Sequence, residues 1–197
     1  MVHIAIVYHS GFGHTTVQAK AVERGAQLVP GVETSLIFVD EIDQHWEKLD
    51  AADAIIFGSP TYMGSASAPF KTFMDKSSTR WLVLKWQNKI ASGFTNSGSA
   101  SGDKLNTLVQ LAIFAAQHGM IWVGSNLMPN TKHANNGEAL NRLGSFLGAM
   151  AQSTNESPEV TPPLSDQLTA EHLGQRVAQV TVQFALGRDA AAAVAWS

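Results

Sequence analysis

The chain has 197 residues, of which 45% are hydrophobic and 15% charged, and its formal net charge is -3. This length is typical of one compact domain, and this composition excludes an intrinsically disordered chain. Because the charge is close to neutral and no basic run occurs, we expect neither nucleic acid nor an anionic membrane surface as a partner.

The absence of cysteine limits the chemistry of the chain. Disulfides, thiolate metal sites and a cysteine nucleophile are excluded, so any redox reaction requires a cofactor. The histidines and carboxylates show no metal-ligand spacing, and we predict no metal site. Residues 1–8 lack the features of a signal peptide, and no apolar run reaches the roughly 20 residues that span a bilayer. A cytoplasmic location is therefore expected.

Five short apolar runs, rich in β-branched and aromatic residues, alternate with longer segments of helical periodicity. The predicted strands are residues 3–8, 34–39, 54–58, 89–95 and 120–124. Alternation of this kind is typical of βαβ units. Because the strands show little polar alternation, we expect helices on both faces of a parallel, doubly wound α/β sheet.

Helices are predicted between these strands from caps and apolar stripes. The first begins near Thr15, where Thr15 and Gln18 have the spacing of a capping box, and a short second helix follows Ser67. The third covers residues 103–118 and the last covers residues 169–186. The inward stripe of the third helix is predicted to consist of Leu105, Leu108, Val109, Ala112 and Ala116.

We predict a single domain over residues 1–187, followed by a frayed, alanine-rich tail over residues 188–197. Residues 125–163 form a long connection rich in Asn, Gly, Ser and Pro, within which the pattern allows a short helix at 138–146. Connections of this length are usually functional or mobile.

Three loops that follow predicted strands have unusual compositions. The first, residues 10–16, places two glycines and several hydroxyls at the start of a helix. Backbone N–H groups and the helix dipole favour a phosphate there, although a glycine turn with hydroxyl caps explains the same residues. This loop matches neither the Walker motif nor the dinucleotide motif.

The second loop, residues 59–64, contains Tyr62 and Gly64, which suit the wall and the close backbone approach that a planar ring requires. A proline-initiated surface turn is the alternative. The third, residues 95–102, is small and polar, and by itself it fits a flexible loop equally well. Ligands of open α/β sheets bind at the carboxyl ends of the strands. Because all three loops converge there, we expect one shared ligand crevice.

Together these loops resemble those of the FMN-binding flavodoxin superfamily, and more narrowly those of the WrbA-type NAD(P)H:quinone oxidoreductases. The resemblance covers residues 1–124 well and the last helix loosely. It implies a five-stranded parallel sheet in the order 2-1-3-4-5. The motifs that carry it are Gly13-His14, Pro60-Thr61 followed by Gly64, Ala68-Pro69-Phe70-Lys71, Trp81, the loop 97–102 and His118-Gly119-Met120.

The resemblance implies that the first loop binds the phosphate of FMN and that the other two frame its isoalloxazine ring. Phe12 and the Tyr62-Met63 pair depart from the family, which often has tyrosine and an Arg-Phe pair there. Residues 127–150, in a region that contributes to the acceptor site of the family, match poorly. The implied cofactor-binding residues are Ser10, Phe12, Gly13, His14, Thr15, Pro60, Thr61, Tyr62, Met63, Gly64, Thr95, Asn96, Ser97, Gly98, Ser99 and Gly102.

His118 is the implied catalytic residue, because a histidine at this place in the family approaches the pyrimidine edge of the flavin. A histidine in the last turn of a helix is also favoured by the helix dipole alone. Trp81 is the implied substrate-binding residue. The apolar segment from Trp81 to Trp86 also suits a subunit contact or ordinary core, and we expect a homodimer or homotetramer that uses it.

We therefore expect an FMN-dependent oxidoreductase with NADH or NADPH as co-substrate. It passes a hydride from nicotinamide to the flavin, and electrons onward to a quinone, free flavin or another small-molecule acceptor. The alternative is a flavodoxin-type one-electron carrier that docks on protein partners. Carriers of that kind are usually strongly acidic, whereas this chain has a net charge of only -3.

Overall fold

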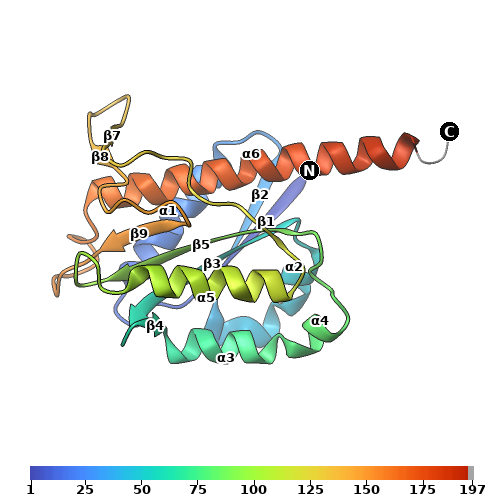
Figure 1. Ribbon diagram of the computed structural model, residues 1–197, viewed down its shortest axis with the longest axis horizontal. Coiled ribbons are helices and arrows are strands. Elements are labelled where there is room, and N and C mark those ends of the chain that lie inside the picture. Colours follow the sequence, from blue (N-terminus) through green and yellow to red (C-terminus); the bar gives the residue numbers. More distant parts are fainter. Residues whose placement is uncertain (195–197) are drawn as a thin grey trace.

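A parallel sheet forms the centre of the computed structural model, which describes residues 1–194 (Figure 1). Its strands lie in the order β2-β1-β3-β5-β6. Because β4 is a short strand outside this order, the five strands repeat the expected order 2-1-3-4-5, and the predicted doubly wound α/β fold is confirmed. The five strands are β1 (Val2–Tyr8), β2 (Val32–Phe38), β3 (Ala54–Tyr62), β5 (Ile90–Ser97) and β6 (Ile121–Trp122).

Two separate strands share the outer position beside β5. The short strand β6 pairs with the first residues of β5, and β9 (Ala149–Gln152) pairs in parallel with its last four. The chain between them contains a small hairpin of β7 (Thr131–Lys132) and β8 (Ala139–Leu140). The short helix considered at 138–146 is therefore wrong, because the left-handed backbone at Asn141 and at Gly144 interrupts a helix.

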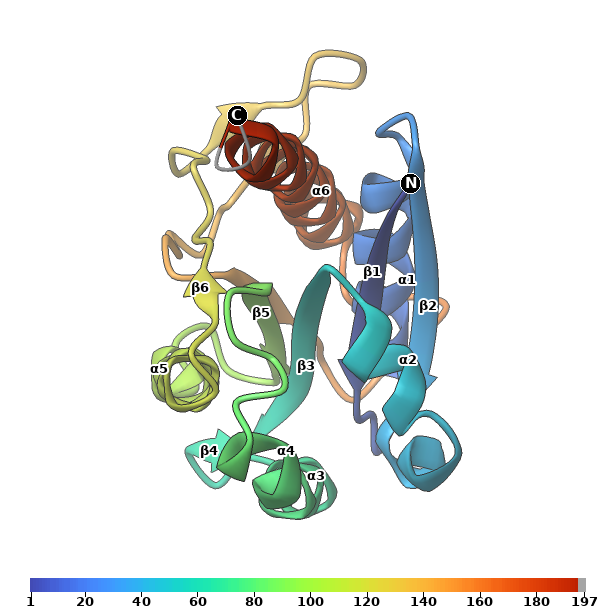
Figure 2. The same ribbon diagram turned by 90° about the vertical axis from the view of Figure 1, so that its right-hand side faces the viewer.

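Helices cover both faces of the sheet, as Figure 2 shows. One face packs against α1 (His14–Gln27) and α6 (Leu164–Val194) through a core that includes Ile4, Ile6 and Val22. A second core covers the opposite face. The helices on that side are η1 (Val39–Gln44), α2 (Trp46–Ala51), α3 (Ala68–Lys76), α4 (Ser78–Leu82) and α5 (Lys104–Gln117).

The start of α1 differs from the capping box that the sequence suggested. The helix begins at His14, and Gly13 occupies the N-cap position with a left-handed φ of 89°. Thr15 and Gln18 are both buried within the helix. A glycine in this conformation satisfies the turn at the carboxyl end of β1 without a side-chain cap.

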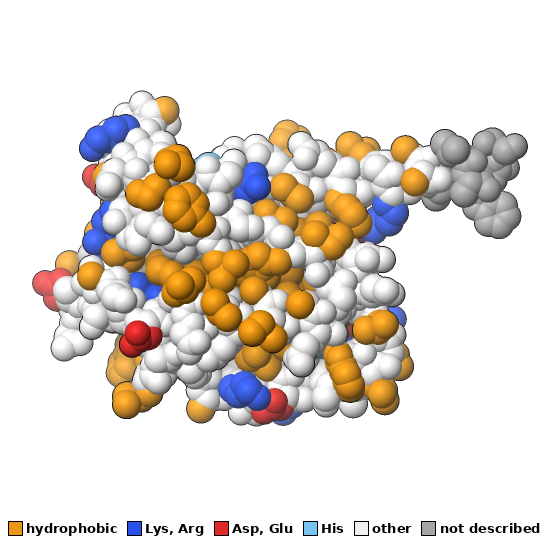
Figure 3. All heavy atoms as spheres, in the orientation of Figure 1, with side chains coloured by type: hydrophobic (Ala, Val, Ile, Leu, Met, Phe, Trp, Pro, Cys, Tyr) orange, Lys and Arg blue, Asp and Glu red, His pale blue; other side chains and the backbone are white. Residues whose placement is uncertain are grey.

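The inward face of α5 also differs from the prediction. Leu108 is buried as expected, but Leu105 and Val109 are exposed. Figure 3 shows hydrophobic side chains gathered on the surface over α5. The buried residues of the helix are Lys104, Thr107, Leu108, Leu111, Phe114 and Ala115. Hydrophobic periodicity missed this face because its first turn buries a lysine and a threonine.

The last helix is longer than predicted at both ends. It begins at Leu164 and continues through Val194, so residues 188–194, expected to belong to a frayed tail, are helical. Its final turns project beyond the sheet in Figure 1. Residues 195–197 lie outside the part that the structure describes.

Within residues 1–194, the helices are all too short or too polar to cross a membrane. Among the side chains that the structure describes, no group of three or more histidine, aspartate or glutamate residues is placed to hold a metal ion. The cytoplasmic location stays a prediction.

Candidate cofactor site

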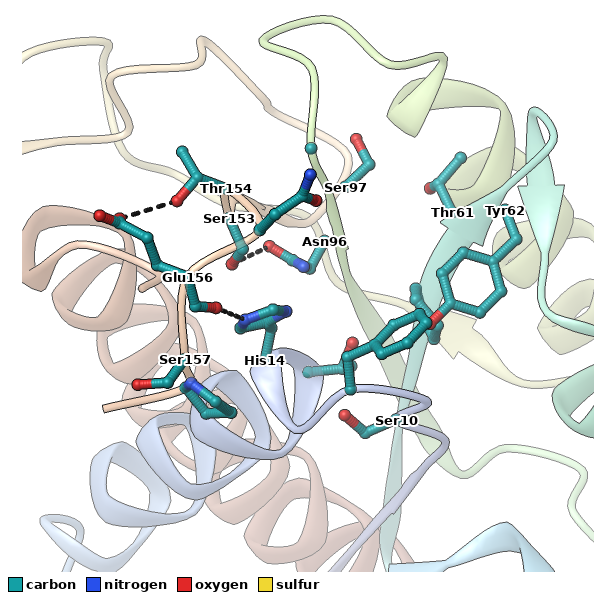
Figure 4. Close-up of a pocket in the computed structure, with 16 residues that line it drawn as sticks. Ser10, His14, Thr61, Tyr62, Asn96, Ser97, Ser153, Thr154, Glu156 and Ser157 are labelled. Atoms are coloured by element: carbon teal, nitrogen blue, oxygen red, sulfur yellow. Dashed lines mark hydrogen bonds between the residues drawn. The ribbon is translucent and has the colours of Figure 1, made fainter. Parts of the chain in front are cut away.

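A cavity of about 670 Å³ opens at the carboxyl ends of β1, β3 and β5 (Figure 4). Its volume lies within the range of about 300 to 1,000 Å³ typical of cofactor pockets. Four chain segments build it, and three of them are the loops that the sequence predicted. The lining residues are Ser10, Phe12, His14, Thr15, Pro60, Thr61, Tyr62, Asn96, Ser97, Gly98, Ser153, Thr154, Asn155, Glu156, Ser157 and Pro158.

The first segment brings hydroxyls and a helix start to one side of the cavity. The Oγ atom of Ser10 accepts a hydrogen bond of 3.3 Å from the backbone N–H of Thr16, which leaves its own hydroxyl hydrogen to donate. Thr15 lies in the first turn of α1 and is buried, with its side chain in the cavity wall. The unpaired N–H groups of this first turn and the helix dipole together favour an anion here.

Gly13 allows the fourth segment to approach this turn. A Cβ atom at residue 13 would lie 2.5 Å from the Cγ atom of Pro158, so a larger residue would push residues 153–158 away. His14 fixes the same segment, because its Nε2 atom lies 2.8 Å from the carbonyl oxygen of Glu156. The first loop, residues 10–16, and residues 153–158 are therefore held against each other.

The second segment is the end of a strand rather than the loop that the sequence suggested. Strand β3 continues through Tyr62, and the turn at Met63 and Gly64 leads into β4 (Ser65–Ala66). Tyr62 contacts Phe12 edge to face, with ring centroids 6.3 Å apart, and both rings line the cavity. Burial raises the pKa of the Tyr62 phenol, which therefore stays neutral and able to donate.

Beneath this aromatic wall lies a buried cluster of three hydroxyls. The Oγ1 atom of Thr61 lies 2.8 Å from that of Thr95 and 2.7 Å from that of Thr107. These bonds join β3, β5 and α5 directly under the cavity. Because each member is satisfied by another, the cluster fixes the floor on which Thr61 stands.

The third and fourth segments meet where β5 pairs with β9. The side-chain oxygen of Asn96 accepts a hydrogen bond of 2.9 Å from the hydroxyl of Ser153, and the backbone N–H of Ser153 donates to the carbonyl oxygen of Ser97. Residues 153–158 were not among the predicted site residues. They reach the cavity because β9 pairs with β5, and no local sequence pattern predicts this pairing. The one available signal was the length and composition of residues 125–163.

The structure places ten of the predicted cofactor-binding residues in the cavity wall. Six others belong to the same segments but do not line it. Met63 points fully into solvent, and the carbonyl of Gly64 accepts a hydrogen bond from Asn106 on the outer side of the turn. The six are Gly13, Met63, Gly64, Thr95, Ser99 and Gly102.

Trp81 and His118 lie outside this cavity. Because α5 runs back along the sheet from the cavity, His118 at its end lies at the amino ends of the strands, beside α4. Both residues line a separate pocket of about 310 Å³. Within one chain, therefore, neither contributes to the wall of the large cavity, and a same-chain contact of either residue with a ligand there is not supported.

His118 is packed as a buried, neutral side chain. Its Nε2 atom lies 2.9 Å from the Oγ of Ser77, whose hydroxyl donates to the carbonyl of Met74, so Nε2 carries the hydrogen. The Nδ1 atom has no partner among the described residues, and the rings of Trp86 and Phe114 lie against the imidazole. Burial lowers the pKa of His118 to about 4.

The segment from Trp81 to Trp86 is divided between surface and core. Trp86 is completely buried, where its Nε1 donates to Asp50, so it cannot form an interface. Residues 81–84 are all exposed, by 45 to 76%. The predicted apolar surface is therefore real but shorter than expected.

The chemistry of the large cavity suits a phosphorylated planar ligand. Its lining contains no lysine or arginine, so a phosphate would be held by hydroxyls, backbone N–H groups and the dipole of α1. The aromatic pair of Phe12 and Tyr62 lies at the other side, where a flat ring can stack. These features fit FMN held without a lysine or arginine in direct contact.

A five-stranded parallel sheet in the order 2-1-3-4-5, with a cavity at the carboxyl ends of its strands, is typical of flavodoxin-like proteins. The model of the family described as NADPH-dependent FMN reductase matches residues 13–134, and the chain belongs to this family. Membership implies FMN binding.

Relatives from three organisms carry names of both carriers and enzymes. The chain is 40% identical to "Flavodoxin FldP" of Pseudomonas aeruginosa, over 90% of this chain and 96% of the relative. It is 31% identical to an "NAD(P)H dehydrogenase (quinone)" of Archaeoglobus fulgidus, over 91% and 97%. A crystal structure of a flavodoxin, WrbA-like protein from Agrobacterium tumefaciens is 41% identical, with a TM-score of 0.73 over 93% of this chain and 99% of that one.

Proposed function

We propose that this protein is an FMN-dependent oxidoreductase that takes electrons from NADH or NADPH and passes them to a quinone, free flavin or another small acceptor. The observation that carries the proposal is the cavity itself. It joins an anion-binding helix start to an aromatic wall whose outer member, Phe12, is 75% exposed, so the ring side of the cavity is open to a second small molecule.

Bound FMN supplies the electron-transfer chemistry, which no side chain of this cysteine-free chain supplies. The chain contributes placement. Ser10 and Thr15 would donate to the phosphate, Thr61 and Tyr62 would hold the ring, and residues 96–98 would supply polar contacts to it. Backbone and hydroxyl donors at that edge stabilise negative charge on the ring.

The carrier function remains the second candidate because a specific relative supports it. The chain is 40% identical to a protein named a flavodoxin. A carrier docks on protein partners, and the exposed side chains of Phe12 and Met63 near the cavity offer an apolar contact for one. The net charge of -3 argues against docking on a strongly basic partner.

Anaerobic mixing of the FMN-loaded protein with NADH or NADPH distinguishes the two functions. In an oxidoreductase, the added nicotinamide reduces the bound flavin without any other protein. A carrier requires a separate reductase.

We further propose that the protein is a homo-oligomer and that residues 81–84 form the contact. The exposed apolar side chains of this segment adjoin the pocket that holds Trp81 and His118. A second copy that brought this pocket to the large cavity would supply the two predicted site residues that one chain keeps apart.

Light scattering at micromolar concentration is expected to give at least twice the chain mass of 21.1 kDa. The double variant Leu82→Asp/Val83→Asp should reduce the mass to that of one chain, because two charges in an apolar contact are strongly unfavourable. The matched control is Leu105→Asp/Ile113→Asp on the exposed face of α5, which should leave the mass unchanged. A wild-type mass of 21.1 kDa would remove the proposal.

A further inference from the structure

A lysine is completely buried behind the wall of the cavity. Lys104 is the first residue of α5 and is 0% exposed. Lysine is almost never fully buried unless its ammonium is satisfied. Its Nζ atom donates to the hydroxyl of Ser97 at 2.9 Å and to the carbonyl oxygen of Ser99 at 2.5 Å. Both acceptors belong to the segment that follows β5, and Ser97 lines the cavity.

The backbone is shaped to allow this contact. Gly102 and Asp103 both adopt left-handed conformations, with φ of 55° and 54°, so the chain folds back sharply before α5 begins. A Cβ atom at residue 102 would lie 2.2 Å from the Oγ of Ser97. The loop is thus closed tightly around the ammonium, with Ser97 between the lysine and the cavity.

The charge of Lys104 is not cancelled by a direct ion pair. Among the side chains that the structure describes, no carboxylate oxygen lies within 4.0 Å of its Nζ atom. The nearby Asp166 is instead occupied by Arg142, through two hydrogen bonds of 2.7 Å. Arg142 also contacts Gln152, whose side chain donates to the carbonyl of Gly98. The loop is therefore held by Lys104 on one side and by Gln152 on the other.

The contact also sets the direction of the Ser97 hydroxyl. Because the ammonium can only donate, Ser97 accepts from it and must donate its own hydrogen elsewhere. Its one hydrogen bond as donor among the described residues, to the carbonyl of Ser99, is 3.5 Å long, which is too long for a strong bond. The hydroxyl is thereby left to donate to a ligand in the cavity.

We propose that Lys104 is a positioning residue for FMN, which orients Ser97 as a donor to the flavin ring and favours the reduced cofactor through its buried positive charge. This inference rests on the proposed function, in that the cavity holds FMN. The reduced ring carries more negative charge than the oxidised ring. A cation in a dry protein layer behind it therefore stabilises the reduced form more than the oxidised form.

The ionisation of Lys104 is consistent with this role. Burial lowers its pKa to about 8, partly opposed by the charge of Asp166 and assisted by that of Arg142. The group is thus still mostly protonated at neutral pH.

The test compares two substitutions of Lys104 in the FMN-loaded protein. Lys104→Met removes both the hydrogen bonds and the charge, whereas Lys104→Gln keeps a donor for Ser97 without the charge. The readouts are the midpoint potential of the bound flavin and the dissociation constant of oxidised FMN. The matched control is Lys89→Met. Lys89 is a partly buried lysine that also donates to backbone carbonyls, those of Asp50 and Ala52, but at the opposite end of the sheet.

Both Lys104 variants are expected to bind reduced FMN about ten-fold more weakly relative to oxidised FMN, which lowers the midpoint potential by about 30 mV for a two-electron couple. Only Lys104→Met should also weaken the binding of oxidised FMN. Lys89→Met should change neither the midpoint potential nor the dissociation constant of oxidised FMN. An unchanged potential in either folded Lys104 variant overturns the inference while leaving the proposed function intact. If the wild-type protein itself fails to bind FMN, the proposed function fails, and the inference fails with it.

Discussion

Replacing Ser10 by alanine together with Thr15 by valine is expected to weaken the binding of FMN by about a hundred-fold. Both hydroxyls lie in the cavity wall at the start of α1. Hydrogen bonds to a charged group contribute about 1.5 to 3 kcal/mol each, and two bonds at the lower value total about 3 kcal/mol. Each 1.4 kcal/mol is a factor of ten in the dissociation constant.

Riboflavin separates this effect from a general loss of structure, because it lacks the phosphate. Its dissociation constant should change little in the double variant. Valine at residue 15 keeps the buried volume of threonine. As a control, Ser65→Ala/Thr72→Ala removes two hydroxyls that donate to the carbonyls of Ala66 and Ala68 outside the cavity, and FMN binding should persist. Equal losses for FMN and riboflavin would refute the phosphate assignment.

Acid should destabilise the protein through His118. Its folded pKa is about 4, against 6.5 for an unperturbed histidine. Between these values the unfolded chain binds a proton that the folded chain does not, so the stability contributed above pH 6.5 is lost as the pH falls towards 4. A shift of this size corresponds to about 3 kcal/mol in the free energy of unfolding. The cause of the lowered pKa is burial of the imidazole, which lies against the rings of Trp86 and Phe114 and has no partner at Nδ1 among the described residues.

Urea unfolding at pH 7 and pH 4.5 measures this contribution. Glutamine in the variant His118→Gln does not titrate but can still hydrogen-bond to Ser77. The comparison therefore separates the effect of protonation from the effect of losing the hydrogen bond. The stability gap between wild type and variant should narrow by about 2 to 3 kcal/mol between the two pH values. A gap that stays constant would show that His118 keeps its ordinary pKa in the folded protein.

The five strands of the parallel sheet and the helices α1, α3, α5 and α6 were predictable because they depend on local signals, whereas the short helices η1, α2 and α4 were not predicted. Apolar runs of strand length marked β1, β3 and β5, and Ser67 and Pro69 marked the start of α3. The general position of the ligand cavity followed from the rule that such sites lie at the carboxyl ends of parallel strands.

The parts of the site that the sequence did not predict depend on contacts between distant segments. The pairing of β9 with β5 brings residues 153–158 to the cavity, although their own sequence indicates only a loop. The burial of Lys104 has no local signal, because lysine is usually exposed and the acceptors of this one are brought together only when the loop before α5 folds. Trp81 and His118 were grouped with the cofactor by resemblance, whereas the topology places them at the other end of the sheet.

The most direct test of the proposed function is anaerobic reduction of the FMN-loaded protein by NADH or NADPH, followed at the visible absorption band of the flavin. We expect one of the two nicotinamides to bleach the band without any other protein, and benzoquinone or free FMN to restore it with repeated turnover. Dithionite serves as the control that the bound flavin is reducible. A flavin that dithionite bleaches but that both nicotinamides leave oxidised would contradict the oxidoreductase and favour the carrier.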